Sequence, residues 1–216
     1  MAEKRSRKAG NSNIDIFALS KTQQIKGNRR LVREKVLQIL FAINFCDAPR
    51  DELFNHIFYR MYKFDINDEG KIDTKKILKP EEIQEIEADI PIHWNASEIE
   101  FGKDLIAKTL ENQTQFDELI EKFSKNWEFD RIALIDKIIM RMSIAQFLYF
   151  PLIPIKVAIN EAIELAKLYS TNSSSTFING ILDAVKSELL EKGMIKKEGK
   201  GLIENNPHKK KSKELN

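Results

Sequence analysis

The sequence contains a single cysteine, Cys46, so no disulfide can form within the chain. It has only eight glycines and six prolines in 216 residues, which is too few for a protein of many tight hairpins. No apolar run approaches the ~20 residues that a membrane-spanning helix needs, and the first residues lack the apolar stretch of a secretory signal. These absences predict a cytoplasmic protein without a membrane partner.

Motifs of enzyme chemistry are also missing. The sequence has neither a GxxxxGK[ST] loop nor a GxGxxG fingerprint, the two patterns whose backbone amides cradle phosphates. Its three histidines, His56, His93 and His208, have no second ligand at the spacing of a zinc site. Cys46 is typical of a small core residue rather than of a nucleophile. We therefore expect no catalytic residue, no metal and no cofactor, and predict that the protein is not an enzyme.

One segment imitates a calcium-binding loop. Residues 65–73 place acidic or amide groups at positions one, three, five and nine of an EF-hand loop, with glycine at position six. Position twelve is Lys76, where the motif needs a bidentate glutamate, so a positive charge replaces two ligand oxygens. A polar turn with a glycine at positive φ is the favoured interpretation of residues 65–76, and calcium binding is the less favoured one.

Charge is distributed unevenly, although the net charge is only +2. Residues 1–35 carry ten lysines and arginines against three acids, and residues 192–216 carry eight lysines against three acids. The middle of the chain is correspondingly acidic. Two basic ends on an acidic body suggest a polyanionic partner. Solubilising tails are the alternative, and for the last 25 residues this alternative is favoured.

Apolar residues recur at helical spacing through most of the chain and predict seven or eight helices and no strand. The apolar stripes run through residues 28–45, 53–61, 97–110, 116–123, 129–147, 155–166 and 177–189, and a short acidic helix is expected after Pro80. Ser97 and Glu100 suggest a capping box, and Gly193 ends the last helix. We divide the chain into a flexible basic leader, a helical domain and a Lys-rich tail. These three parts are residues 1–27, 28–191 and 192–216.

The first predicted helix begins with three arginines. In a helix Arg29 and Arg33 are four residues apart and Arg30 lies beside them, so we expect their guanidinium groups to fan across one end. Guanidinium grips phosphates in a bidentate way and stacks on bases, which suits single-stranded RNA. The alternative is a solvated basic helix start, but positive charge there opposes the helix dipole. The three arginines therefore predict an RNA-binding surface.

Four blocks of the sequence resemble the NusB family. Residues 153–167, IPIKVAINEAIELAK, are similar to the family's IP-x-x-VAINEAIELAK block, and residues 177–183, FINGILD, to its FVNGVLD helix start. Residues 127–142 resemble its W…R…D…ILR-A signature. Residues 29–40 resemble the RR-x-x-R-x-x-x-x-Q-x-L pattern of its first helix. The four blocks occur in the order that the family shows.

The resemblance covers roughly residues 28–48 and 113–190. It implies an all-α fold of two packed helical bundles, residues 28–112 and 113–191. It also implies a function, which is to bind the boxA element of nascent RNA as a heterodimer with NusE, a small-subunit ribosomal protein. The pair would join the RNA polymerase antitermination complex, mainly in ribosomal RNA operons. Some family members self-associate, and the resemblance leaves self-association open for this chain.

The resemblance also implies site residues. The family's RNA-facing positions match four arginines and one aromatic stacking platform, which are Arg29, Arg30, Arg33, Arg141 and Phe177. The positions that meet NusE match Phe41, where the family often has tyrosine, and Asp136. A structural interpretation stays open for some of these residues. Arg141 could pair with Asp136 or another buried acid, and Phe177 could lie in the core.

Two other functions remain as alternatives. NusB-like domains also precede cytosine-5 rRNA methyltransferase domains, although this chain has neither a Rossmann-like segment nor the catalytic cysteines of such enzymes. The second alternative is a helical protein-interaction module of the NusB fold that has lost RNA binding. Its acidic body would then be the contact surface.

Overall fold

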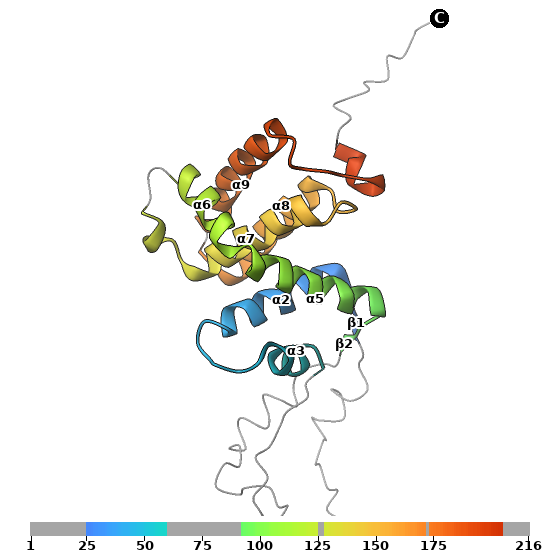
Figure 1. Cartoon of the computed structure of the whole chain (residues 1–216). Coiled ribbons are helices and arrows are strands. Elements are labelled where there is room, and N and C mark those ends of the chain that lie inside the picture. The colour runs from blue at the N-terminus through green and yellow to red at the C-terminus, as the bar shows by residue number, and fades with distance from the viewer. Residues whose placement is uncertain (1–24, 60–91, 125–127, 172, 205–216) are drawn as a thin grey trace, which may run out of the picture.

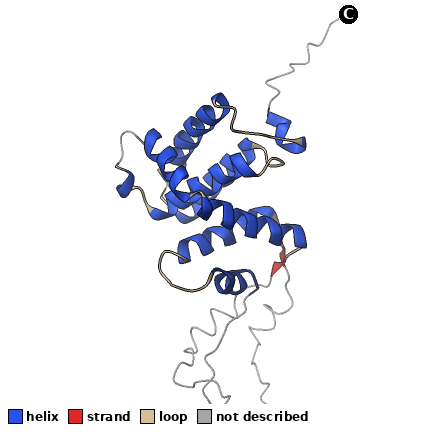
Figure 2. Ribbon diagram, viewed as in Figure 1, coloured by secondary structure: helices blue, strands red, loops and turns tan. Residues whose placement is uncertain are grey.

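The computed structural model of the chain describes residues 25–59, 92–124, 128–171 and 173–204. Its α-helices are α2 (Arg29–Ala42), α3 (Arg50–Tyr59), α5 (Ala96–Glu111), α6 (Gln113–Phe123), α7 (Leu134–Tyr149), α8 (Ile155–Tyr169) and α9 (Ser174–Glu191). Two 3-10 helices, η2 (Phe129–Arg131) and η3 (Gly199–Glu204), and two strands, β1 (Ile25–Lys26) and β2 (Ile92–His93), complete the described part. Helices dominate the structure (Figure 2), and the predicted all-α class is confirmed. The helix expected after Pro80 and the EF-hand-like residues 65–76 lie outside the described residues.

A two-residue parallel strand pair precedes the first described helix, and the sequence did not predict it. The pair joins residues 25–26 to residues 92–93. Gly27 continues the pairing, because its N–H donates to the carbonyl of His93 at 2.8 Å. Residues 25–27, which the prediction assigned to the flexible leader, therefore take part in a strand pairing. Strands of this length have too few side chains to leave a pattern of alternation in the sequence.

Asparagine side chains start two of the helices. Asn28 caps α2, since its Oδ1 accepts the backbone N–H groups of the second and third helical residues. At the start of α5 the capping box is formed by Asn95 and Glu98, whose side chains each accept the other's backbone N–H at 2.9 Å. The predicted box of Ser97 and Glu100 is wrong, because the helix begins two residues earlier than that pair requires.

Helix α7 joins two groups of helices. Helices α2, α3 and α5 pack together, and α6, α8 and α9 pack around α7, while α2 and α5 also lie against α7 (Figure 1). Every residue of α7 from Ile138 to Phe147 is buried, and one hydrophobic core runs through both groups. The predicted bundle boundary at residues 112 and 113 falls between α5 and α6. The division into two bundles stays a prediction, since the core is continuous across it.

The chain after α9 returns to the turn between α7 and α8. Gly193 ends α9 in the left-handed conformation, with φ +63°, as predicted. The Lys197 ammonium then donates to the carbonyls of Gln146, at 2.8 Å, and Phe150, at 3.0 Å, at the C-terminal end of α7. A cation at this end of a helix also complements the helix dipole. The prediction of a solubilising tail from residue 192 is therefore wrong for the residues around Lys197.

Gly201 completes this contact with the α7–α8 turn. It is buried, and a Cβ atom at this position would overlap the carbonyl oxygen of Pro151. The same carbonyl accepts the backbone N–H of Glu198 at 3.0 Å. Only glycine lets the returning chain approach the turn this closely. We call residues 194–202 the docked C-terminal segment.

In the part of the chain that the structure describes, no helix combines the length and apolar character needed to cross a bilayer.

Candidate nucleic-acid interface

Two of the three predicted arginines lie on the surface at the start of α2. Arg29 is exposed, and its guanidinium carbon lies 4.9 Å from the centre of the Phe101 ring. Arg30 is also exposed, and its Nη2 lies 3.3 Å from a carboxylate oxygen of Glu164 on α8. Among the described residues, Arg29 has no carboxylate within ion-pair distance. Arg29 therefore offers a guanidinium that a phosphate can reach.

The third arginine, Arg33, is turned into the protein. Its side chain is 4% exposed, its Nε donates to Oε1 of Gln146 at 2.7 Å, and its Nη1 donates to the carbonyl of Arg29 at 3.0 Å. The carboxylate of Glu161 lies 3.8 Å away. Burial lowers the pKa of Arg33 to about 10, although Glu161 acts in the opposite direction. The expected fan of three exposed guanidinium groups is therefore wrong for Arg33, which shares the buried face of α2 with Val36.

Arg141 is also buried and paired. It is 7% exposed and forms two hydrogen bonds with the Asp117 carboxylate, from Nε at 2.6 Å and from Nη2 at 2.8 Å. This bidentate pair ties α7 to α6. The sequence left Asp136 or another acid as the partner of Arg141, and the structure selects Asp117. Arg141 is therefore in the interior and not in the exposed set with Arg29 and Arg30.

The predicted aromatic platform, Phe177, lies in the first turns of α9. It is partly buried and packs against the core. Most of its ring is therefore covered in this structure. A stacking role for Phe177 stays a prediction that depends on the part of the ring left open.

The two predicted partner-binding residues differ in exposure. Phe41 is 37% exposed at the end of α2, where its ring centre lies 4.9 Å from that of Phe45, which is 70% exposed. Asp136 is buried, its Oδ2 accepts a hydrogen bond from Ser174 at 2.8 Å, and its Oδ1 has no partner among the described residues. Phe41 is thus placed where a partner protein can reach it, and Asp136 is not.

A surface network beside Arg30 was missed by the sequence analysis. Glu164 accepts a hydrogen bond from Lys167 at 2.8 Å, and this bond, with the nearby charges of Lys167 and Arg30, lowers the pKa of Glu164. On the same side, the Tyr169 hydroxyl donates to the carboxylate of Glu34, and burial together with this bond raises the pKa of Tyr169 to about 12. Helical spacing could have predicted the Glu164–Lys167 pair. Nothing local in the sequence predicts the contacts between α8 and α2.

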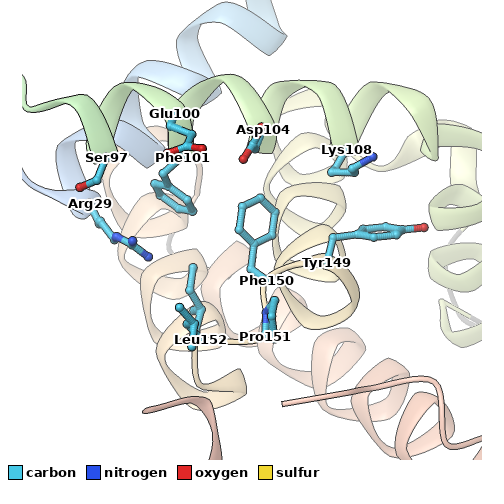
Figure 3. A pocket seen from close by; sticks show the side chains of 11 residues that line it. Arg29, Ser97, Glu100, Phe101, Asp104, Lys108, Tyr149, Phe150, Pro151 and Leu152 are labelled. Carbon is cyan, nitrogen blue, oxygen red and sulfur yellow. The ribbon is translucent and has the colours of Figure 1, made fainter. Parts of the chain in front are cut away.

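Arg29 also lines a pocket between α5 and the α7–α8 turn, which we call the α5 pocket (Figure 3). Its volume is about 340 Å³. The lining residues are Arg29, Ser97, Glu100, Phe101, Asp104, Lys108, Tyr149, Phe150, Pro151, Leu152 and Ile153. The rings of Phe101 and Phe150 meet edge to face, with their centres 5.4 Å apart. The pocket thus combines aromatic walls, two carboxylates of α5 and one exposed guanidinium.

Acidic, histidine and cysteine side chains of the described residues do not gather in any group of three or more that could hold a metal ion.

Known proteins resemble the chain in sequence and in fold. The sequence model of the NusB family matches residues 55–187. The transcription antitermination protein NusB of Natranaerobius thermophilus is 42% identical over 162 residues, which are 75% of this chain and 96% of that protein. A structure of T. maritima NusB superposes with a TM-score of 0.55 at 27% identity, covering 76% of this chain and 94% of that one. A crystal structure of the antitermination factors NusB and NusE in complex with dsRNA contains a chain of the same fold. That chain superposes with a TM-score of 0.53 at 18% identity, covering 74% of this chain and 96% of that one.

Proposed function

The chain belongs to the NusB family, and on that premise we propose that it is an RNA-binding transcription antitermination factor and not an enzyme. It binds boxA-type single-stranded RNA together with a NusE ribosomal protein, and the pair supports antitermination by RNA polymerase in ribosomal RNA operons. The name of the Natranaerobius relative supports the antitermination role. The structure of NusB and NusE with dsRNA supports the choice of partners. The proposal includes a cytoplasmic location.

The observation that carries the proposal is the pair of exposed arginines at the start of α2. Arg29 and Arg30 place two guanidinium groups at a helix N-terminus, where no acid occupies the first turn. Two guanidinium groups at one helix end favour phosphate, which each of them can bind in a bidentate way. The hydrogen bond from Arg33 to the carbonyl of Arg29 holds the first turn of α2 in place. In this proposal Arg29 and Arg30 contact RNA, whereas Arg33 and Arg141 act by positioning the helices that carry the surface.

A second surface suits the protein partner. Phe41 and Phe45 form an exposed aromatic pair at the opposite end of α2 from Arg29. Exposed aromatic side chains of this kind are enriched among the residues that carry binding energy at protein interfaces. We assign this pair to NusE and assign the buried Asp136 a role in fixing the start of α7 against α9.

The test is an RNA titration of the full chain, with and without NusE. We expect wild type to bind a boxA-type single strand and to bind it more tightly when NusE is present. The Arg29→Ala/Arg30→Ala variant should bind more weakly in both cases. Equal binding of wild type and variant would contradict the proposed RNA surface.

The two alternative functions predict different results. If the chain is a protein-interaction module, it should bind NusE and should show no measurable affinity for RNA. A detached domain of an rRNA methyltransferase would act with a catalytic partner and would support methyl transfer from S-adenosylmethionine to rRNA. Antitermination activity without methyl transfer is the outcome that the proposal requires.

A further inference from the structure

The α5 pocket adjoins the proposed RNA surface at the start of α2, and the two share one residue. Arg29 belongs to both, because its backbone begins α2 and its guanidinium lines the pocket (Figure 3). At about 340 Å³ the pocket lies near the lower end of the about 300–1,000 Å³ that is typical of small-ligand sites. It is therefore large enough for one flat ring system and too small for a folded segment of a partner.

The walls of the pocket are flat and apolar. Phe101 and Phe150 meet edge to face at its base, and Leu152 lies across from Phe101 (Figure 3). Phe101 is only 4% exposed and the guanidinium groups of Arg29 and Arg33 lie over its ring, so the aromatic ring open to a ligand is that of the half-buried Phe150. Packing against Phe101 holds the Phe150 ring in place before a ligand binds. Stacking on an aromatic side chain stabilises the binding of a nucleobase, and it does so for any base.

The polar groups of the pocket are hydrogen-bond acceptors on one side and a cation at one end. Glu100 and Asp104 are exposed, stand one turn apart on α5, and have no ion-pair partner within 4.0 Å among the described residues. Lys108, one turn further along, is already paired with Glu111 at 2.9 Å. Arg29 stands at the end of the pocket beside Phe101. The open partners of this site are thus two carboxylates and one guanidinium.

Resting on the function proposed above, we propose that the α5 pocket holds one unpaired nucleobase of the bound RNA. The base stacks against the apolar wall, the carboxylates of Glu100 and Asp104 accept hydrogen bonds from its amino edge, and Arg29 binds the adjoining phosphate. A nucleotide is the ligand that offers a flat ring, amino donors and an anion at once.

A cationic side chain of a protein partner is the competing ligand, since it would also meet carboxylates and aromatic rings. The position of Arg29 argues against it. The Arg29 guanidinium already occupies a place over the Phe101 ring, and its charge would repel a second cation. The same charge attracts the phosphate of a nucleotide.

The proposed contacts also predict which bases the pocket accepts. Carboxylate oxygens accept hydrogen bonds from the exocyclic amino groups of cytosine, adenine and guanine. Uracil carries no amino group, so it can form fewer of these bonds. We expect one position in the RNA where an amino-bearing base is preferred over uracil.

The test uses the full chain and a mixed-sequence single-stranded RNA of about 12 nucleotides. Glu100→Ala/Asp104→Ala removes the acceptors, and Glu118→Ala/Glu121→Ala on α6 is the matched control, because it removes two exposed acids elsewhere. Charge alone predicts tighter RNA binding for both variants. The proposal predicts the opposite for the pocket variant, which should bind roughly 5- to 100-fold more weakly, while the control binds as tightly as wild type or tighter.

A second measurement replaces each amino-bearing base of the RNA by uracil in turn. At one position the replacement should weaken binding of wild type roughly 5- to 100-fold and leave binding of the pocket variant unchanged. This coupling separates a direct contact from a loss of folding, which far-ultraviolet circular dichroism of both variants also checks.

Three outcomes decide between the proposals. If wild type binds RNA and the pocket variant binds as tightly as the α6 control for every RNA, the pocket inference is overturned and the proposed function stands. If wild type binds no RNA, the proposed function fails and the pocket inference fails with it. If the pocket variant loses affinity for NusE but keeps its affinity for RNA, the pocket holds a cationic side chain, and the nucleobase inference is overturned.

Discussion

The Nε of Arg33 and the Oε1 of Gln146 lie 2.7 Å apart, and both side chains are buried. This hydrogen bond crosses from the first turns of α2 to the last turns of α7. It fixes the helix that carries the exposed Arg29 and Arg30 to the central helix of the fold. Arg33, which the sequence pattern grouped with the RNA-binding arginines, therefore stabilises from the protein interior the helix that carries the proposed RNA surface.

Replacement of Arg33 by methionine should destabilise the protein by about 3 kcal/mol, because it leaves the Gln146 amide oxygen buried without its donor and removes the cation beside Glu161. Urea denaturation measures the loss. Arg29→Met is the control, and because Arg29 is exposed we expect it to change the free energy of unfolding by less than about 0.5 kcal/mol. An Arg33→Met protein as stable as wild type would show that the buried pair contributes nothing.

The Arg29→Ala/Arg30→Ala variant should show a weaker dependence of RNA binding on salt. Each phosphate contact with a single strand contributes about 0.7 to the slope of log affinity against log salt concentration, so the slope should become shallower by about 1.4. Arg50→Ala/Arg131→Ala, which removes two exposed arginines from other elements, is the control and should keep the wild-type slope. Parallel slopes for the two double variants would rule out phosphate contacts at the start of α2.

Tyr169 should ionise near pH 12, and the ultraviolet absorbance of tyrosinate measures this directly. Burial and the hydrogen bond to Glu34 favour the neutral phenol in the folded state, whereas an unfolded tyrosine ionises near pH 10. Between these values the folded state holds a proton that the unfolded state has lost. The stabilisation from Tyr169 is therefore complete below about pH 10 and is lost as the pH rises through about 12.

Two variants check the origin of this shift. Tyr169→Phe should remove the late ionisation step. Glu34→Gln should move the pKa of Tyr169 back toward 10 but not fully, because burial is the larger cause. An unchanged pKa in the Glu34→Gln protein would mean that the carboxylate has no influence on Tyr169.

The helices were predictable from the sequence because each buries one apolar face. The stripe from Val32 to Leu40 and the turn at Pro151 and Pro154 mark their elements by local chemistry alone. The family resemblance predicted the function, and it predicted which positions of the chain match those that bind RNA and NusE in the family. Helical spacing did not predict which arginine is buried. It places Arg33 one turn before the buried Leu37, but it also places the exposed Arg29 one turn before Arg33.

The rest of the site depends on contacts between distant segments. The pairing of Arg141 with Asp117 joins two helices whose relative position no local pattern specifies. The α5 pocket arises only where the α7–α8 turn meets α5, so its lining residues are scattered in the sequence. The contact of Lys197 with the end of α7 was not predicted, because a lysine-rich stretch has the composition of a solvated tail.

Gly201→Ala should release the docked C-terminal segment, because the new Cβ would overlap the Pro151 carbonyl oxygen. Hydrogen exchange of the residues around Lys197 should then become faster. Gly180→Ala is the matched control. The Gly180 position lies within α9 with open space around it, so alanine should stabilise the helix by about 0.5–1 kcal/mol. Slow exchange around Lys197 in the Gly201→Ala protein would show that the turn yields to the added methyl group.

The Trp94 side chain donates a hydrogen bond to the carbonyl of Phe58 at 2.9 Å, and its ring packs against that of Phe58. Positions 59 and 92 are thereby fixed close to each other by the folded helices on either side. A single side chain thus anchors the C-terminal end of α3 to the residues that lead into α5, so loss of the Trp94 indole would separate the two ends of the N-terminal helix group.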